Sequence, residues 1–508
     1  MYFEECRARD YKECLVAVGY GSYSVGVRSL ESSMKLTVTG GLFCLLTVFF
    51  FFRPAHTHGR HQEKPTKMFV AWKIEVKKVV LSVLIRVAWF VDFVLFDVIG
   101  LSGPWLLRRL LVPARLRRIA VRLSGVEEEK YHLSIEEMDR RLRRSVDAVA
   151  SMGEESKLKG CGRHGRTLRL GLAAVRALER RLVRQLVVDL LVTLRKNDQM
   201  PEDPLVIVGP QRSGTTILFE LLGLDSDNWR QLLTHEATLP IAKTKVSGAL
   251  LDAGHEWLAG SELILDSVKH VHHERWDGPV ECRAALENGV GAPHVLWYVF
   301  GATKSLDSYL LSDEDRFSDY EFYKKQLGAL EQKKRWLLKD PAHCFSLDAL
   351  FKAFPKATVI WMHRSPEKSA PSLCSLMSGL WRGLLREEHF SSLEPPNFHA
   401  SVVEYLATML DRATAYRAQH PNAKIIDVAQ EDLREHPLKV IDRIYSECAQ
   451  TMSPAARHNM IAFLDKENNK QKQHPHIYRL EDFGLQEGII KQRFKNYINA
   501  PFFPVAAQ

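Results

Sequence analysis

The segment Pro204 to Leu224, which reads PLVIVGPQRSGTTILFELLGL, constrains the fold of this 508-residue chain more than any other. Leu205 to Val208 form a short, partly β-branched apolar run that is typical of a buried strand. Thr215 to Leu222 have the spacing of a helix. The strand, Gly-rich loop and helix together predict a phosphate cradle, because glycine lets backbone amides approach an anion and a helix N-terminus presents aligned N–H donors.

The loop has the spacing of the nucleotide triphosphatase motif G-x-x-x-x-G-K-[ST], but Thr215 occupies the position of the lysine. That lysine serves β- and γ-phosphates, so its replacement argues against ATP or GTP hydrolysis and favours a ligand with a single 5′-phosphate. Arg212 offers a fork of donors for a phosphate or sulfate. The alternative is a plain turn in which Ser213 caps the helix. We predict a phosphate site formed by Arg212, Ser213, Gly214, Thr215 and Thr216.

After Pro204, short apolar runs alternate with helical stretches, which predicts an α/β fold with a P-loop-like parallel sheet flanked by helices. Further strands are expected at 231–233, 336–338 and 357–362. A helix at 345–354 between the last two would complete a βαβ unit.

Three polar residues stand at or just beyond the expected strand ends. Lys339 follows the strand at 336–338, Arg364 follows the strand at 357–362, and Ser372 lies eight residues after Arg364 on the next expected helix. Ligands of such folds bind at the carboxyl ends of the strands, so Lys339 and Arg364 are well placed for a site. The alternative is that both are strand-end side chains in solvent.

On these motifs the chain resembles the PAPS-dependent sulfotransferase superfamily, in its broad bacterial-type branch, from about Leu205 to Pro501. The likeness includes the tail from Glu467 to Leu485. The resemblance implies that the loop binds the 5′-phosphosulfate of 3′-phosphoadenosine-5′-phosphosulfate (PAPS) and that Arg364 and Ser372 bind its 3′-phosphate. It also implies in-line transfer of a sulfuryl group to an acceptor hydroxyl or amine, with no metal.

Related tyrosylprotein sulfotransferases suggest the catalytic residues. Lys339 resembles the lysine with which they stabilise the transition state, and Glu236 resembles a glutamate that follows their second strand. We therefore expect Glu236 as the general base, with Lys339 and Arg212 as the cations at the reacting group. The alternative for Glu236 is a surface carboxylate that caps the next helix. His235 stands where the family often has tryptophan, which leaves the acceptor open.

A second group of acid–base side chains, His272, His273 and Glu274, also invites an active-site or metal interpretation. Adjacent residues point in different directions on a helix or strand, so they rarely bind one ion together. The eight cysteines are scattered without a Cys-x-x-Cys pair. We therefore predict no metal site.

The region before the phosphate loop is apolar and basic. Residues 36–52 are uncharged, at the short end of the roughly 17–25 residues that span a bilayer, and predict a transmembrane anchor. A signal peptide or a buried helix are the alternatives, and translation starting at Met34 instead of Met1 would still include this segment. We expect a polar segment at 1–35, a membrane-proximal helical region at 53–129, a helical extension at 130–200 and the catalytic domain at 201–508.

A net charge of +9 favours anionic partners. With no zinc-finger spacing or RNA-binding motif, nucleic acid is not expected among them. The sequence predicts a single-pass membrane protein in the Golgi or another endomembrane, and leaves open the side on which the catalytic domain lies. The acceptor is open between a lipid, a glycan, a small molecule and a protein. The competing functions are a P-loop kinase or NTPase and an inactive nucleotide-binding scaffold.

Overall fold

The computed structural model describes the larger part of residues 201–508 and short pieces before them. The described residues are 121, 127–131, 134–143, 185, 188–189, 191–193, 200–238, 240, 277–286, 310–312, 316–330, 334–384, 398–471 and 478–504. The expected anchor at 36–52, nearly all of 53–129 and the cluster at 272–274 lie outside these ranges. In the part of the chain that is described, no helix is both long enough and apolar enough to cross a membrane.

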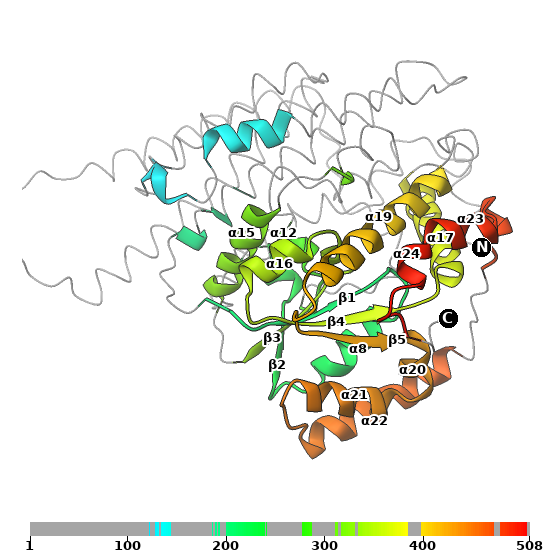
Figure 1. Ribbon diagram of the computed structural model, residues 1–508. Helices are drawn as coiled ribbons and strands as arrows, with labels where there is room; N and C mark the ends of the chain where they lie inside the picture. Colours follow the sequence, from blue (N-terminus) through cyan, green and yellow to red (C-terminus); the bar gives the residue numbers. More distant parts are fainter. Residues whose placement is uncertain are drawn as a thin grey trace, which may run out of the picture. The chain divides into compact units, whose positions relative to one another are not determined.

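Parallel strands form the centre of the described region, in the order β2-β3-β1-β4-β5, and every neighbouring pair is parallel (Figure 1). The strands are β1 (Leu205–Val208), β2 (Trp229–Gln231), β3 (Arg335–Lys339), β4 (Thr358–His363) and β5 (Ile425–Ala429). The predicted α/β class with a parallel sheet is confirmed.

The strand predicted at 231–233 is wrong in its bounds, because β2 ends at Gln231. The next residues leave the sheet to pair with a distant segment. The backbone N–H of Val280 donates to Leu232 O at 2.9 Å, and Leu233 forms an antiparallel bridge with Pro279. The carboxyl end of β2 is therefore tied to the segment 277–286.

Both faces of the sheet are buried, as the apolar strand runs require. Val206 and Val208 belong to one core, whereas Leu205 and Ile207 belong to the other. This alternation follows from the period of two of a strand.

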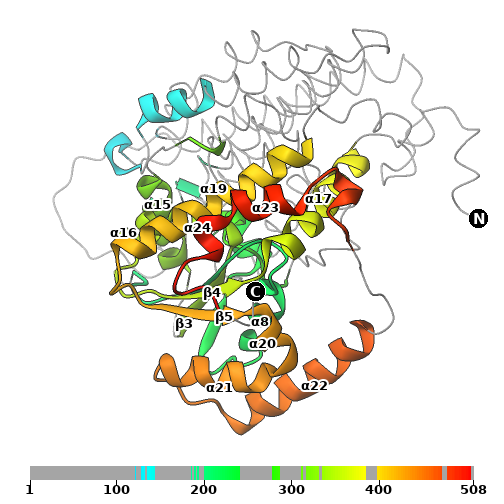
Figure 2. The same cartoon turned by 45° about the vertical axis from the view of Figure 1, so that its right-hand side comes forward.

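Helices cover both faces of the sheet (Figures 1 and 2). One core is built with α9 (Thr234–Thr238), α12 (Arg283–Leu286), α15 (Phe317–Ala329), η4 (Pro341–Phe345), α16 (Leu347–Ala353), α17 (Pro366–Leu384), α19 (Phe398–Gln419), η5 (Glu481–Phe483), α23 (Glu487–Arg493) and α24 (Lys495–Ile498). The other is built with α8 (Thr215–Gly223), α20 (Gln430–Glu435), α21 (Pro437–Glu447) and α22 (Pro454–Gln471). The helix predicted at 345–354 is divided, since η4 ends at Phe345 and α16 begins at Leu347.

Several of the described residues between 130 and 200, the range of the predicted helical extension, are helical. Residues 135–143 are helical, and Arg141 connects them to α15. Its guanidinium donates to Ser318 Oγ at 2.7 Å and forms an ion pair with Asp319.

Gly209 allows β1 to lie directly against β4. Its φ is +138°, and a Cβ at this position would lie 2.4 Å from the carbonyl oxygen of Met362. Gly484 also has a positive φ, +66°, but no atom lies within 4 Å of its Cβ position. A side chain at either position would strain the backbone, but only a side chain at Gly209 would also clash with a neighbouring strand.

We expect Gly209→Ala to lower the free energy of unfolding by about 2–4 kcal/mol, because it adds a backbone clash to the strain. Gly484→Ala should cost only about 1–2 kcal/mol, the strain of a left-handed residue. Urea unfolding followed by circular dichroism measures both. Equal losses in the two variants would contradict the steric argument.

The end of β4 is fixed by a buried polar network around His363. Its Nδ1 lies 2.9 Å from the Tyr497 hydroxyl and its Nε2 lies 2.9 Å from Asp427 Oδ1. Arg417 binds both oxygens of Asp427, at 2.5 and 2.8 Å. A neutral imidazole that donates from Nε2 and accepts at Nδ1 satisfies these contacts. Burial lowers the pKa of His363, although Asp427 acts to raise it.

Because the folded pKa of His363 lies below the unfolded value of 6.5, the unfolded state binds more protons as the pH falls. The contribution of His363 to stability is therefore present above pH 6.5 and declines as the pH falls towards the lowered folded pKa. We expect the melting temperature of His363→Gln to depend less steeply on pH between 7 and 5 than that of the wild type. The exposed His458 supplies a control, and an identical slope in His363→Gln and His458→Gln would contradict the assignment.

Candidate active site

The phosphate loop leaves β1 with several residues in the left-handed region. The φ values are +138° for Gly209, +70° for Arg212 and +89° for Gly214. Gly214 is the N-cap of α8 and provides no side-chain cap. The buried Ser213 Oγ has no hydrogen-bond partner, so the alternative in which Ser213 caps the helix is wrong. The loop instead leaves a hydroxyl and the start of a helix for a ligand.

The strained peptide of Arg212 is held by a side chain from the neighbouring strand. Arg364, directly after β4, donates from Nη1 to the Arg212 carbonyl at 2.6 Å. A left-handed residue other than glycine costs roughly 1–2 kcal/mol, which a hydrogen bond from a charged donor can offset. The second predicted motif thus supports the shape of the first.

The two motifs also meet through their side chains. Arg212 Nε donates to Ser372 Oγ on α17 at 3.3 Å. Burial, and then the positive charge of Arg212, lower the pKa of the Arg364 guanidinium. Arg364 Nε is buried without a hydrogen-bond partner. Two adjacent guanidiniums with an open donor favour an anionic ligand. The structure therefore brings together Arg212, Ser213, Arg364 and Ser372, and these groups fit a phosphorylated nucleotide.

Lys339, the last residue of β3, supplies a cation beside the start of α8. Its side chain is buried and its Nζ lies 3.3 Å from Thr216 Oγ1. The alternative that Lys339 is a strand-end lysine in solvent is therefore wrong. Although Thr215 replaces the lysine of the triphosphatase motif, a lysine from the adjacent strand reaches the next threonine.

Glu281 is the partner of Lys339, and the sequence analysis did not identify it. Its Oε1 accepts from Lys339 Nζ at 2.7 Å, and its Oε2 pairs with Arg283. The available signal was a carboxylate between the buried Val280 and Cys282, but no local pattern connects this segment with Lys339. The contact arises only from the fold.

Glu236 lies in α9, where its carboxylate is engaged locally. Its Oε1 accepts from Arg230 Nη2 at 2.7 Å and its Oε2 accepts from the backbone of Leu233 at 3.2 Å. Arg230 in turn lies over the Trp336 ring, 4.1 Å from its centroid. Glu236 is buried, in contrast to the surface carboxylate of the alternative, but it does bond an amide at the start of its helix. Its role as the general base stays a prediction.

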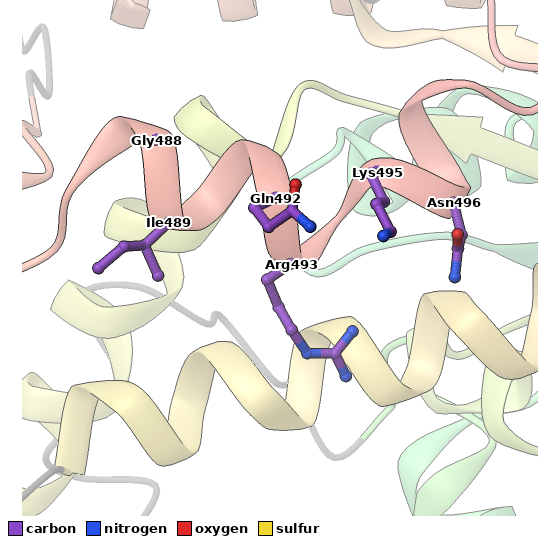
Figure 3. Close-up of a pocket in the computed structure, with 6 residues that line it drawn as sticks. All are labelled: Gly488, Ile489, Gln492, Arg493, Lys495 and Asn496. Atoms are coloured by element: carbon purple, nitrogen blue, oxygen red, sulfur yellow. The ribbon is translucent and has the colours of Figure 1, made fainter.

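A hollow at the surface lies beside α23 and α24 (Figure 3) and includes none of the predicted site residues. Arg493 extends from it towards α19, where it binds Glu404 at 2.8 Å and Asp411 at 2.6 Å. These ion pairs hold the C-terminal helices on the sheet domain.

Among the described residues, no group of three or more His, Cys, Asp or Glu side chains could hold a metal ion.

A parallel sheet that gathers a Gly-rich phosphate loop, two arginines and a lysine at the carboxyl ends of its strands defines a nucleotide-binding group-transfer protein. Residues 204–454 match the model of the sulfotransferase family, and this part of the chain belongs to that family.

Two curated relatives are named as sulfotransferases. The relatives are the omega-hydroxy-beta-dihydromenaquinone-9 sulfotransferases Stf3 of Mycobacterium bovis and Mycobacterium tuberculosis, each 25% identical over 259 residues. The alignment covers 48% of this chain and 62% of each relative, so the chain spans less than two thirds of their length.

The similar solved structures are sulfotransferases of mycobacteria. STF9 from Mycobacterium avium has a TM-score of 0.58 and 22% identity, covering 78% of this chain and 98% of that one. STF1 from Mycobacterium tuberculosis H37Rv has a TM-score of 0.54 and 23% identity, covering 75% and 97%. At these identities the likeness establishes the fold.

We expect 3′-phosphoadenosine-5′-phosphate to raise the melting temperature of the full-length protein by several degrees. A ligand at one hundred times its dissociation constant adds about 2.7 kcal/mol of stability, and the dianion relieves the repulsion between Arg212 and Arg364. AMP should produce a smaller shift. Arg364→Ala should abolish the difference between the two nucleotides, whereas Arg457→Ala, at an exposed ion pair with Asp442, should preserve it. Equal shifts with AMP and the bisphosphate in the wild type would contradict a 3′-phosphate site.

Proposed function

We propose that this protein transfers a sulfuryl group from PAPS to an acceptor hydroxyl or amine by in-line displacement. The observation that supports this most directly is the position of Lys339, between the phosphate loop at Thr216 and the carboxylate of Glu281. The family match over residues 204–454 agrees with it.

In this proposal the loop and the residues after β4 bind different phosphate groups of the donor. Arg212, Ser213, Gly214, Thr215 and Thr216 hold the 5′-phosphosulfate, and Arg364 with Ser372 holds the 3′-phosphate. The acceptor oxygen forms a bond to sulfur while the bond from sulfur to the 5′-phosphate oxygen breaks. Negative charge develops on the departing phosphate oxygen, so cations fixed beside it lower the barrier. Lys339 and Arg212 have that role.

The proton of the acceptor must leave as its oxygen attacks, and Glu281 is our candidate to receive it. Glu281 touches Lys339, the cation assigned to the reacting group, whereas Glu236 is bound to Arg230 and to its own helix. Glu281 lies between Lys339 and Arg283, so its carboxylate stands beside the cation assigned to the reacting group.

Glu281→Gln and Glu236→Gln distinguish the two candidate bases. If Glu281 is the base, Glu281→Gln should lower kcat by about 10²- to 10⁴-fold, the usual worth of a general base. Glu236→Gln should instead lower the melting temperature, because it weakens the pair between the buried Glu236 and the partly buried Arg230, and leave kcat within a few-fold. Binding of 3′-phosphoadenosine-5′-phosphate to both variants controls for damage to the donor site. A large loss of kcat in Glu236→Gln alone would return the role to Glu236.

For the acceptor we propose a hydroxyl on an apolar, lipid-like carrier. The curated relatives are named for a hydroxylated dihydromenaquinone. The uncharged run at 36–52 and the apolar and basic region at 53–129 support an enzyme that works at a membrane surface. We accordingly propose a single membrane anchor at 36–52, with an endomembrane such as the Golgi as the location. A glycan, a small soluble molecule or a protein would be the alternative acceptor.

The function is tested with the full-length protein and PAPS labelled with sulfur-35, in the presence of a total membrane-lipid extract. The expected result is labelled lipid in the organic phase from wild type and its loss in Lys339→Ala. Label in soluble glycan or protein instead would correct the acceptor class. A folded protein that binds ATP but not 3′-phosphoadenosine-5′-phosphate would overturn the function and favour the kinase alternative. Donor binding without transfer to any acceptor class would favour the scaffold.

A further inference from the structure

Asp340 follows Lys339 directly and is completely buried. Its Oδ2 accepts from the backbone N–H of Arg283 at 2.7 Å, and its Oδ1 accepts from the backbone N–H of Ala342 at 2.9 Å. Arg283 is the first residue of α12, and Ala342 lies in the first turn of η4. One carboxylate therefore serves the starts of two helices from different parts of the chain.

These contacts fix the backbone on both sides of the Lys339–Glu281 pair. The N–H of Cys282 donates to Lys339 O at 3.0 Å, so residues 282 and 283 are bonded in succession to residues 339 and 340. The N–H of Asp340 also donates to Ile207 O, at 3.2 Å. Asp340 thus joins β1, the end of β3 and the segment that carries Glu281.

An aspartate is not required to cap the start of one helix. Serine and asparagine cap helices about as well as aspartate does, and each avoids placing a charge in the interior. Only a carboxylate has two equivalent acceptor oxygens for amides that arrive from separate segments. Its charge acts on its surroundings: burial, and then the charge of Asp340, raise the pKa of the Tyr320 hydroxyl and of the Cys282 thiol.

We propose that Asp340 is a positioning residue, which sets Glu281 against Lys339 so that base and cation face the same reacting group. This inference rests on the proposed sulfuryl transfer and adds a residue that contacts neither donor nor acceptor. Without Asp340, the start of α12 loses its anchor to β3 and Glu281 can move away from Lys339. A displacement of about 1 Å at such a site can lower the rate about 100-fold.

The test compares Asp340→Ala, Asp340→Asn and the exposed control Asp348→Ala in the full-length protein. The measurements are consumption of sulfur-35 PAPS with the membrane-lipid extract, its pH profile, the dissociation constant of 3′-phosphoadenosine-5′-phosphate and the melting temperature. Asp340→Ala should lower kcat about 100-fold, with donor affinity changed less than about 3-fold and a shifted pH profile, because the base is displaced. Asp340→Asn keeps one acceptor oxygen and should recover part of kcat, and Asp348→Ala should match the wild type.

The outcomes separate the inference from the function on which it rests. An active wild type with equally active Asp340→Ala overturns the positioning role and leaves the proposed function intact. Parallel losses of kcat and donor affinity, with an unchanged pH profile, mean that Asp340 only supports the fold, which also overturns the role. A wild type that binds 3′-phosphoadenosine-5′-phosphate but never consumes PAPS, or that binds neither, overturns the function and with it this inference.

Discussion

Positive charge is concentrated at the carboxyl edge of the sheet, and the arrangement of the surrounding segments depends on how each charge is balanced. Lys339 is fully buried and is balanced by Glu281. Arg364 and Arg212, by contrast, bind a carbonyl and a hydroxyl, which are neutral oxygens. A buried or half-buried cation without an anionic partner is costly unless an anion arrives. Among the described residues, Lys339 thus has a carboxylate bound directly to it, whereas Arg364 is opposed by Arg212 and attracted by Glu431 without a direct carboxylate contact, which leaves room for an anionic ligand.

The end of the chain stabilises the same edge. Tyr497 contacts the imidazole of His363, the residue that precedes Arg364. Burial raises the pKa of the Tyr497 hydroxyl well above its usual value. Arg493 adds ion pairs to Glu404 and Asp411 on α19. The end of β4, next to Arg364, is therefore held partly by a residue of α24.

The parts of the site that could be predicted from the sequence are those in which local pattern and position agree. The phosphate loop has its own strand and helix, and the strand-end rule was sufficient to select Lys339 and Arg364. Glu281 was out of reach, because hydrogen bonds to Leu232 and Lys339 bring its segment to the site and neither is visible in a local pattern. The sequence prediction ends the second strand at Leu233, two residues beyond the end of β2. This error places Glu236 just past a strand end, where a catalytic residue is expected. In the structure it lies inside α9 and pairs with Arg230.

The threonine at the lysine position of the phosphate loop and the buried Lys339 on the next strand can be explained together, by where the cation has to stand. In a triphosphatase the lysine extends from the loop itself, along the line of β- and γ-phosphates. Here the cation comes from β3, beside β1, and reaches Thr216 from the side, with a carboxylate bound to it. A lysine in this position leaves the loop free for one phosphate and places its charge next to a group that could take a proton. Such an arrangement suits an acceptor that must be deprotonated as it attacks, and Asp340 matters because it fixes the strand and the carboxylate-bearing segment to each other.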